Sequence, residues 1–80
     1  MRATVYVSLK PGVLDPQGKA VHRSLETLGF EEVEGVRIGR AITLDLEAPD
    51  AAQARARLEE MCQKLLANPV IEDYRIELEG

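Results

Sequence analysis

The sequence predicts an α+β fold, in which two helices cover one face of an antiparallel sheet with a long central strand. Three segments, at about 3–9, 33–47 and 70–79, alternate apolar and polar residues, which is typical of half-buried strands. The two segments between them repeat apolar residues every three or four positions, as helices with one buried face do. Because every element has a single apolar face, a two-layer sandwich in the order β-α-β-α-β would bury all of them.

The first strand, which contains Ala3, Val5 and Val7, ends at Lys10-Pro11-Gly12. The first helix is expected to run from Pro16 to Leu28, after an N-cap at Asp15. Gly29 suits a left-handed C-terminal stop, and Phe30 can then fold back onto the helix. The apolar stripe of this helix consists of Val21, Leu25 and Leu28.

The segment 33–47 is open to two interpretations. Gly39-Arg40 could form a two-residue hairpin turn, but such a turn would place Val36 and Leu44 on opposite faces of the sheet. A single strand instead keeps one unbroken period of two through the whole segment. We therefore expect one long strand with a bend or bulge at Gly39. Fifteen residues (33–47) is long for so small a fold, so one half of the strand is expected to extend beyond its own sheet.

The second helix is expected to begin after Asp50, with Gln53 placed for a capping-box-like start, and to end at Asn68-Pro69. Its expected apolar face consists of Ala54, Leu58, Met61, Cys62, Leu65 and Leu66. In the last strand, from Val70 to Glu79, the residues expected to face inward are Tyr74, Ile76 and Leu78. This element order fits a ferredoxin-like unit whose middle hairpin has opened into one strand.

Composition favours a single domain, residues 1–80, that is stabilised by a partner chain. The chain has three aromatic residues and no Trp, so its core is thin. Apolar burial in such a small domain roughly cancels the entropy of chain ordering. One Cys excludes an internal disulfide, and one Cys with one His makes a zinc site improbable. Oligomerisation is the remaining source of stability, and we expect a symmetric dimer or tetramer with strand pairing across the boundary.

Charge and hydropathy exclude other classes of partner. The net charge of −4 and the absence of a basic stripe argue against nucleic-acid binding. No apolar run approaches the roughly 18 residues of a membrane span, and the N-terminus lacks the features of a signal peptide. A lone Cys without an export signal indicates the cytoplasm.

No catalytic or metal-binding constellation emerges. His22 lies beside the first apolar stripe without a nucleophile or paired carboxylate, which favours a surface histidine. Cys62 lies on the expected core face, where it acts as a small hydrophobic residue. The loop from Lys10 to Gly18 lacks a Walker motif, and Asp15 sits where a phosphate would bind. Arg40 interrupts an apolar stripe, so it either extends its charge to solvent at the sheet edge or pairs across a subunit boundary.

Four segments resemble one known family when taken together. They are Val5-Tyr6-Val7-Ser8-Leu9-Lys10, Val13-Leu14-Asp15-Pro16-Gln17-Gly18, Val36-Arg37-Ile38-Gly39-Arg40 and Met61-Cys62-Gln63-Lys64-Leu65-Leu66-Ala67-Asn68-Pro69-Val70-Ile71-Glu72-Asp73-Tyr74. In this order the chain resembles PurS, the small subunit of phosphoribosylformylglycinamidine (FGAM) synthase. The family usually carries Glu where this chain has Gln63.

The resemblance implies a PurS-like fold, related to the ferredoxin-like one, and a role in de novo purine synthesis. It implies a non-catalytic subunit of a carbon–nitrogen ligase that bridges the large synthetase subunit, PurL, and the glutamine amidotransferase subunit, PurQ, and assists ammonia transfer. This chain would bind no cofactor itself, while PurL would use ATP and magnesium. Candidate subunit-interface residues are Lys10, Asp15, Gln17, Arg37, Arg40 and Tyr74.

Two other classes of function remain open at this point. One is a regulatory module that binds a free amino acid near the loop from Lys10 to Gly18. The other is a stand-alone enzyme, which would need convergent polar groups that the sequence does not show. Saturable binding of an amino acid would favour the first class, and co-purification with two larger subunits would favour the PurS-like role.

Overall fold

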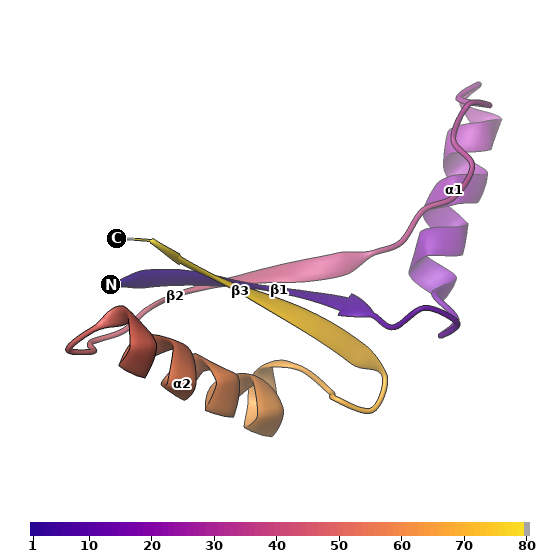
Figure 1. Ribbon diagram of the computed structural model, residues 1–80. Coiled ribbons are helices and arrows are strands. Elements are labelled where there is room, and N and C mark those ends of the chain that lie inside the picture. The colour runs from indigo at the N-terminus through magenta and orange to yellow at the C-terminus, as the bar shows by residue number, and fades with distance from the viewer. Residues whose placement is uncertain (80) are drawn as a thin grey trace.

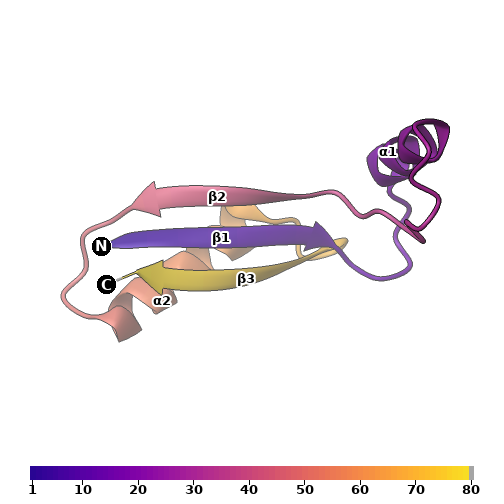
Figure 2. The same cartoon turned by 90° about the horizontal axis from the view of Figure 1, so that it is seen from above.

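A computed structural model describes residues 1–79 and places the elements in the predicted order (Figure 1). The strands are β1 (Arg2–Leu9), β2 (Gly39–Asp45) and β3 (Glu72–Glu79). The helices are α1 (Pro16–Thr27) and α2 (Ala51–Met61), and a π-helical turn, η1 (Cys62–Leu66), continues α2. Strand β1 lies between β2 and β3 and pairs antiparallel with both, as Figure 2 shows from above. The α+β class and the antiparallel sheet are thus confirmed.

The core lies between the sheet and α2. Alternate residues of β1 (Ala3, Val5 and Val7) are buried, as predicted. The register places Val5 between Ile42 of β2 and Ile76 of β3, so each row of the sheet presents aliphatic side chains to the helix. Leu58 of α2 and Cys62 of η1 belong to the same core cluster, and Ala54 of α2 is also buried.

The position of α1 differs from the prediction that both helices cover one face of the sheet. Only α2 covers the sheet within residues 1–79, and α1 lies beyond the end of the strands (Figures 1 and 2). The extended segment 30–38 runs back beside α1, and we call α1 and this segment the arm. The apolar stripe of α1 correctly suggested a helix that packs on another surface. The pattern does not identify that surface, and the sheet of the same chain was the wrong choice.

Both ends of α1 match the predicted capping. The Asp15 carboxylate accepts a hydrogen bond from the Gly18 amide at 2.9 Å. At the C-terminal end Gly29 has a φ of +97°, and the amides of Gly29 and Phe30 donate to the carbonyls of Glu26 and Leu25, which is a Schellman stop. Helix α2 is capped in the same way by Asp50, whose side chain accepts from the Gln53 amide at 2.8 Å.

The expected long strand at 33–47 divides into a paired half and an unpaired half. Residues 39–45 pair with β1, while residues 33–38 continue without a strand partner into the arm. No hairpin forms at Gly39, which instead pairs with Ser8 as the first residue of β2. A Cβ atom at this position would lie 2.6 Å from the Val7 carbonyl oxygen, so glycine permits a close approach of the two backbones.

The second helix ends in a π turn that the sequence pattern did not predict. The Ala67 amide donates to the Cys62 carbonyl at 3.1 Å, five residues back, which is the π-helical bond. The extra residue in this turn rotates Leu65 out of the core. Leu65 is 82% exposed, so its assignment to the buried face was wrong for the isolated chain.

Candidate subunit-interface site

Asp15 ties the two segments of the arm together, next to the start of β2. Its two carboxylate oxygens accept from different segments, one from the Gly18 amide at 2.9 Å and the other from the Ile38 amide at 2.7 Å. Asp15 is only 5% exposed, and it is the one buried charged residue of the described chain. The hydrogen bond from the Ile38 amide, and after it the one from the Gly18 amide, holds the pKa of Asp15 below its usual value. The residue therefore caps α1 and fixes the start of β2 with a single charged side chain.

Arg37 holds the loop that precedes α1. Its guanidinium donates to the carbonyl oxygens of Val13 at 3.0 Å and Lys10 at 3.1 Å. Lys10 in turn pairs with Asp73 of β3 at 3.1 Å. These contacts connect the loop, the arm and the outer strand. They make the loop from Lys10 to Gly18 a fixed part of the surface.

Arg40 forms an ion pair that crosses the sheet. Its guanidinium binds both carboxylate oxygens of Glu72 at 2.7 and 3.2 Å, and it also donates to the Leu66 carbonyl at 2.6 Å. Glu72 is mostly buried, with a side chain 12% exposed, and Arg40 holds its pKa below the usual value with help from the Asn68 amide. The pair links the two edge strands above β1 and closes the end of the core.

The sequence left two interpretations of Arg40 open, and the structure of the single chain adds a contact that neither included. The side chain is half exposed, but its charge is paired with Glu72 of the same chain instead of being left free in solvent. This intrachain contact satisfies most of the guanidinium donors. It makes Arg40 a positioning residue for the end of η1, and any contact with another subunit would add to that role.

Tyr74 lies on the helix-facing side of β3. Its hydroxyl donates to the Glu59 carboxylate at 2.6 Å and accepts from the Gln63 amide at 2.9 Å. The bond to Glu59 raises the pKa of the Tyr74 hydroxyl. In the register Val7 is opposite both Tyr74 and Arg40, so the two candidate residues belong to one row of the sheet.

Five of the six candidate interface residues gather where the arm meets the sheet, namely Lys10, Asp15, Gln17, Arg37 and Arg40. A cavity of about 250 Å³ lies there, lined in part by Asp15, Gln17, Arg40 and Glu72. Tyr74 stands apart, beneath α2. The charged side chains of this cluster are engaged elsewhere in the same chain, Lys10 with Asp73, Arg40 with Glu72, and Asp15 and Arg37 with backbone groups. These contacts hold the arm in position.

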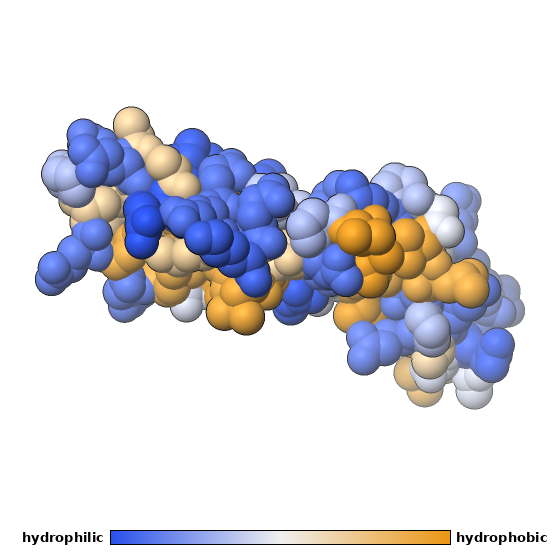
Figure 3. All heavy atoms as spheres, turned by 90° about the horizontal axis from the view of Figure 1, so that it is seen from below, coloured by the Kyte–Doolittle hydropathy of each residue, from blue (hydrophilic) through white to orange (hydrophobic). Residues whose placement is uncertain are grey.

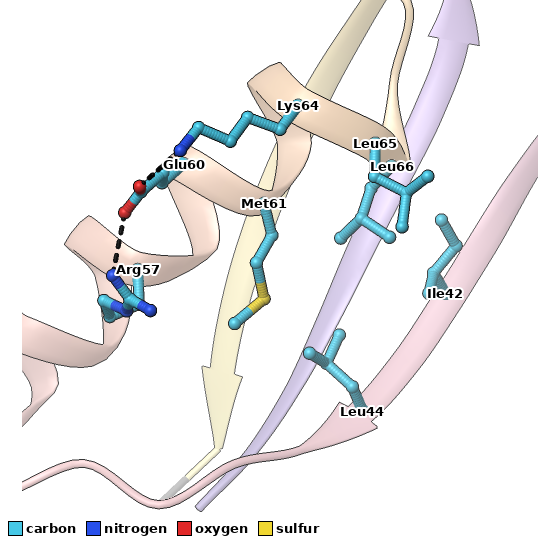
Figure 4. A pocket seen from close by; sticks show the side chains of 8 residues that line it. All are labelled: Ile42, Leu44, Arg57, Glu60, Met61, Lys64, Leu65 and Leu66. Atoms are coloured by element: carbon cyan, nitrogen blue, oxygen red, sulfur yellow. Dashed lines mark hydrogen bonds and ion pairs between the residues drawn. The ribbon is translucent and has the colours of Figure 1, made fainter.

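A second surface was missed in the sequence. An apolar groove of about 370 Å³ lies between α2, η1 and the free edge of β2 (Figure 4). We call it the α2–β2 groove, and its apolar lining is Ile42, Leu44, Met61, Leu65 and Leu66. At its rim Glu60 pairs with Arg57 at 2.9 Å and with Lys64 at 2.8 Å, as the dashed lines in Figure 4 mark. The apolar alternation was visible in the sequence, but it gave no sign that this side of the sheet would remain uncovered.

Groups suited to catalysis are sparse in the described part of the chain. Burial raises the pKa of the Cys62 thiol, which therefore stays protonated and unreactive. The His22 ring bonds the Val33 carbonyl at 2.8 Å and Glu26 at 3.2 Å, which ties the arm together. Residues 1–79 contain no group of three side chains arranged to hold a metal ion. No helix among these residues has the length and apolar character needed to span a bilayer.

Comparison with known proteins gives matches along nearly the whole chain. The family model PurS, described as phosphoribosylformylglycinamidine (FGAM) synthase, matches residues 2–80. The PurS subunit of this synthase from Synechocystis is 54% identical over 74 residues, which cover 92% of this chain and 74% of the relative.

Solved structures share the fold, including the extended arm. The crystal structure of Methanocaldococcus jannaschii PurS superposes with a TM-score of 0.89 at 45% identity, covering 98% of this chain and 94% of that one. A chain in the structure of PurLQS from Thermotoga maritima superposes with a TM-score of 0.88 at 30% identity, covering 95% of this chain and 93% of that one. The sequence and the fold agree, and the chain belongs to the PurS family.

Proposed function

We propose that this chain is the small subunit of an FGAM synthase and acts in de novo purine synthesis. The enzyme complex converts formylglycinamide ribonucleotide to formylglycinamidine ribonucleotide with ATP and glutamine. The observation that carries the proposal is the match of 95% of the chain to a chain of the PurLQS structure, including the arm and the sheet. We place the protein in the cytoplasm, where the substrates of this pathway are found.

The proposed role is to bridge PurL and PurQ and to assist the transfer of ammonia between them. The charged groups at the junction of arm and sheet support this role, because they fix the position of the arm relative to the half of the chain that contains α2 and the sheet. Asp15 and Arg37 hold the arm, while Arg40 and Glu72 hold the end of α2. A rigid chain with two outward surfaces is suited to connect two larger subunits.

The proposal assigns ATP and magnesium to PurL and no cofactor to this chain. The two carboxylates at the junction of arm and sheet are engaged within the chain, since Asp15 bonds two amides and Glu72 bonds Arg40 and the Asn68 amide. Equilibrium dialysis of the isolated chain against ATP and magnesium tests this assignment. Retention of nucleotide at micromolar concentrations would contradict it.

Reconstitution tests the bridging role. Purified PurL and PurQ are mixed with glutamine, ATP and substrate, with and without this chain, and both product formation and co-elution of the subunits are measured. We expect this chain to be required for both. Full glutamine-dependent activity and stable association of PurL with PurQ in its absence would overturn the role.

The chain is also proposed to form a homo-oligomer, a dimer or a tetramer. Its radius of gyration is 16.0 Å. A compact domain of this length has a radius of about 12 Å. Such an extended chain leaves its arm without a covering layer. Sedimentation at micromolar concentration is expected to give a mass that is a multiple of 8.8 kDa, and a monomer would contradict this.

A further inference from the structure

The arm holds a cleft of its own, which we call the arm cleft. It has a volume of about 310 Å³ and lies between the start of α1, the loop 12–15 and the returning segment 35–37. Its lining includes the polar side chains of Lys19, His22 and Arg37 and the apolar ones of Val13, Leu14 and Val36. Figure 3 shows this mixture on one face of the arm, where apolar side chains lie beside hydrophilic ones at the right of the view.

Two cationic side chains with unused donors line the arm cleft. Lys19 takes part in none of the ion pairs formed within residues 1–79. Arg37 uses two of its five N–H donors on the carbonyl oxygens of Val13 and Lys10, which leaves three for another acceptor. The cleft therefore offers an ammonium and a guanidinium group to an acceptor from outside the chain.

The carboxylate of Asp15 also lines the cleft, but it does not cancel this charge. Asp15 is 5% exposed, and its two oxygens accept the amides of Gly18 and Ile38. One carboxylate against the two cations of Lys19 and Arg37 leaves an excess of one positive charge, on a chain whose net charge is −4. Because Asp15 occupies the end of α1, an anion attracted to this charge would lie beside the helix and not at its end.

Gly35, on the wall of the cleft, is a second and independent indication of a ligand. Its φ is not in the left-handed region, and a Cβ atom there would meet no atom within 4 Å. Neither the backbone conformation nor the packing of residues 1–79 therefore requires glycine at this position. Glycine also allows a molecule from outside to approach the backbone closely, and the arm cleft is where such a molecule would lie.

We propose that the arm cleft binds the phosphate group of a small phosphorylated molecule, with Lys19 and Arg37 as the side chains that contact the phosphate. Arginine and lysine are the usual partners of phosphate oxygens in proteins. A volume of about 310 Å³ is at the small end of the range for ligand sites. This inference adds a ligand to the chain and does not depend on the role with PurL and PurQ.

His22 favours a sugar phosphate over phosphate alone. Its Nε2 atom lies 2.8 Å from the Val33 carbonyl oxygen, so Nε2 carries the proton, and in the neutral ring Nδ1 is a hydrogen-bond acceptor. The contacts of the ring within residues 1–79 are made by Nε2, to Val33 and Glu26, and leave Nδ1 available. An acceptor beside two cations suits a ligand that carries a hydroxyl group near its phosphate, as sugar phosphates do.

The binding test is a titration of the isotope-labelled full chain with ribose 5-phosphate and, separately, with inorganic phosphate, both at constant ionic strength. Amide shifts in NMR spectra are the readout. We expect the amides of Gly12 and Gly35 to shift and to saturate with a dissociation constant of about 1 mM, and ribose 5-phosphate to bind more tightly than phosphate. Shifts that do not saturate, or that spread over basic residues outside the arm, would overturn the site. Equal affinity for the two compounds would overturn the contact assigned to His22.

Three variants, with folding checked by circular dichroism, locate the site. Lys19→Gln removes one phosphate contact and should raise the dissociation constant about tenfold, since a hydrogen bond to a charged group contributes at least this much. The matched control Arg23→Gln removes the same charge from α1 outside the cleft and should leave binding unchanged. Gly35→Ala adds a methyl group where the chain has room for it, so it should keep the fold and weaken binding.

Two results with these variants would overturn the proposal. An equal loss in Lys19→Gln and Arg23→Gln would show a general attraction of anions to the helix and no site in the cleft. Unchanged binding in Gly35→Ala, with a changed oligomeric mass in sedimentation, would show that the glycine serves a contact with another chain instead.

Discussion

The side chains with the largest structural effect in this small protein are those whose charge bonds more than one segment. Arg40 binds the Glu72 carboxylate and the Leu66 carbonyl, and Glu72 also accepts the Asn68 amide at 2.7 Å. An exposed ion pair between neighbouring strands, such as Arg2 of β1 with Asp45 of β2, contributes little to the free energy of unfolding because solvent screens it. The Glu72 carboxylate is mostly buried, so it depends on Arg40 to stabilise its charge.

Arg40→Ala should therefore lower the free energy of unfolding more than Arg2→Ala does. Loss of the Arg40 side chain leaves the mostly buried Glu72 carboxylate without its partner, whereas loss of Arg2 leaves Asp45 in solvent. Urea denaturation of both variants measures the difference. An equal loss in the two variants would show that Glu72 does not need Arg40.

Acid should weaken the fold through Glu72. Its pKa is lowered in the folded state, so its stabilising contribution is full above the pKa of unfolded glutamate, about 4.3, and is lost as the pH falls through the lower folded value. Glu72→Gln should lower the free energy of unfolding at pH 7. It should also make this free energy decline less steeply as the pH falls below about 4.5. Denaturation midpoints across this range provide the measurement, and a slope unchanged by the substitution would contradict the assignment.

Gly29 provides a backbone test at the end of α1. Its φ of +97° strains any residue that carries a Cβ atom, although the site has open space around it. Gly29→Ala should cost about 1 kcal/mol of stability. The exposed control Gln53→Ala should cost clearly less in the same denaturation experiment. Similar losses would indicate that the Schellman stop contributes little.

Cys62 tests the core in the same way. The residue is fully buried at the start of η1, so Cys62→Ser would bury a hydroxyl among aliphatic side chains and should destabilise the fold more than Cys62→Ala. Denaturation of the two variants gives the comparison. Rapid modification of the native thiol by a maleimide would contradict the buried, protonated state.

At the scale of elements, the sequence predicts local features well because they depend on neighbouring residues. The caps at Asp15 and Asp50, the stop at Gly29 and the alternation in β1 and β3 all follow from short-range chemistry. The sequence also indicated that the segment 33–47 would extend beyond its sheet. The position of α1 was not predicted, because an apolar stripe does not identify the surface on which it packs. The π turn at Cys62 was not predicted either, because one extra residue in a turn leaves no clear pattern in the sequence.

The unpaired half of the long strand gives a prediction at this scale. No backbone hydrogen bond joins residues 34–37 to the rest of the described chain, residues 1–79. An extended segment with free amides is suited to pair with a strand of another chain. Hydrogen exchange of these amides should be slow at concentrations at which the chain is oligomeric and fast after dilution to the monomer. Fast exchange in both would exclude strand pairing by this segment.

At the scale of the whole molecule, the extended shape and the PurS family membership both indicate a chain that works through contacts with other chains. The chain measures 50 × 26 × 14 Å along its principal axes and has few groups suited to catalysis within residues 1–79. Its fixed surfaces are suited to contacts with other chains. The candidate interface residues found in the sequence mainly hold the arm in place, while the groove they leave open was visible only in three dimensions.

The central claim is that this chain acts in assembly and ammonia delivery and not in the ligation itself. The most direct test is the rate of product formation by PurL and PurQ, with and without this chain, first with glutamine and then with ammonium as the nitrogen source. We predict that omission of the chain lowers the glutamine-dependent rate far more than the ammonium-dependent rate, because ammonia from solution bypasses delivery. An equal loss with both nitrogen sources would contradict the account.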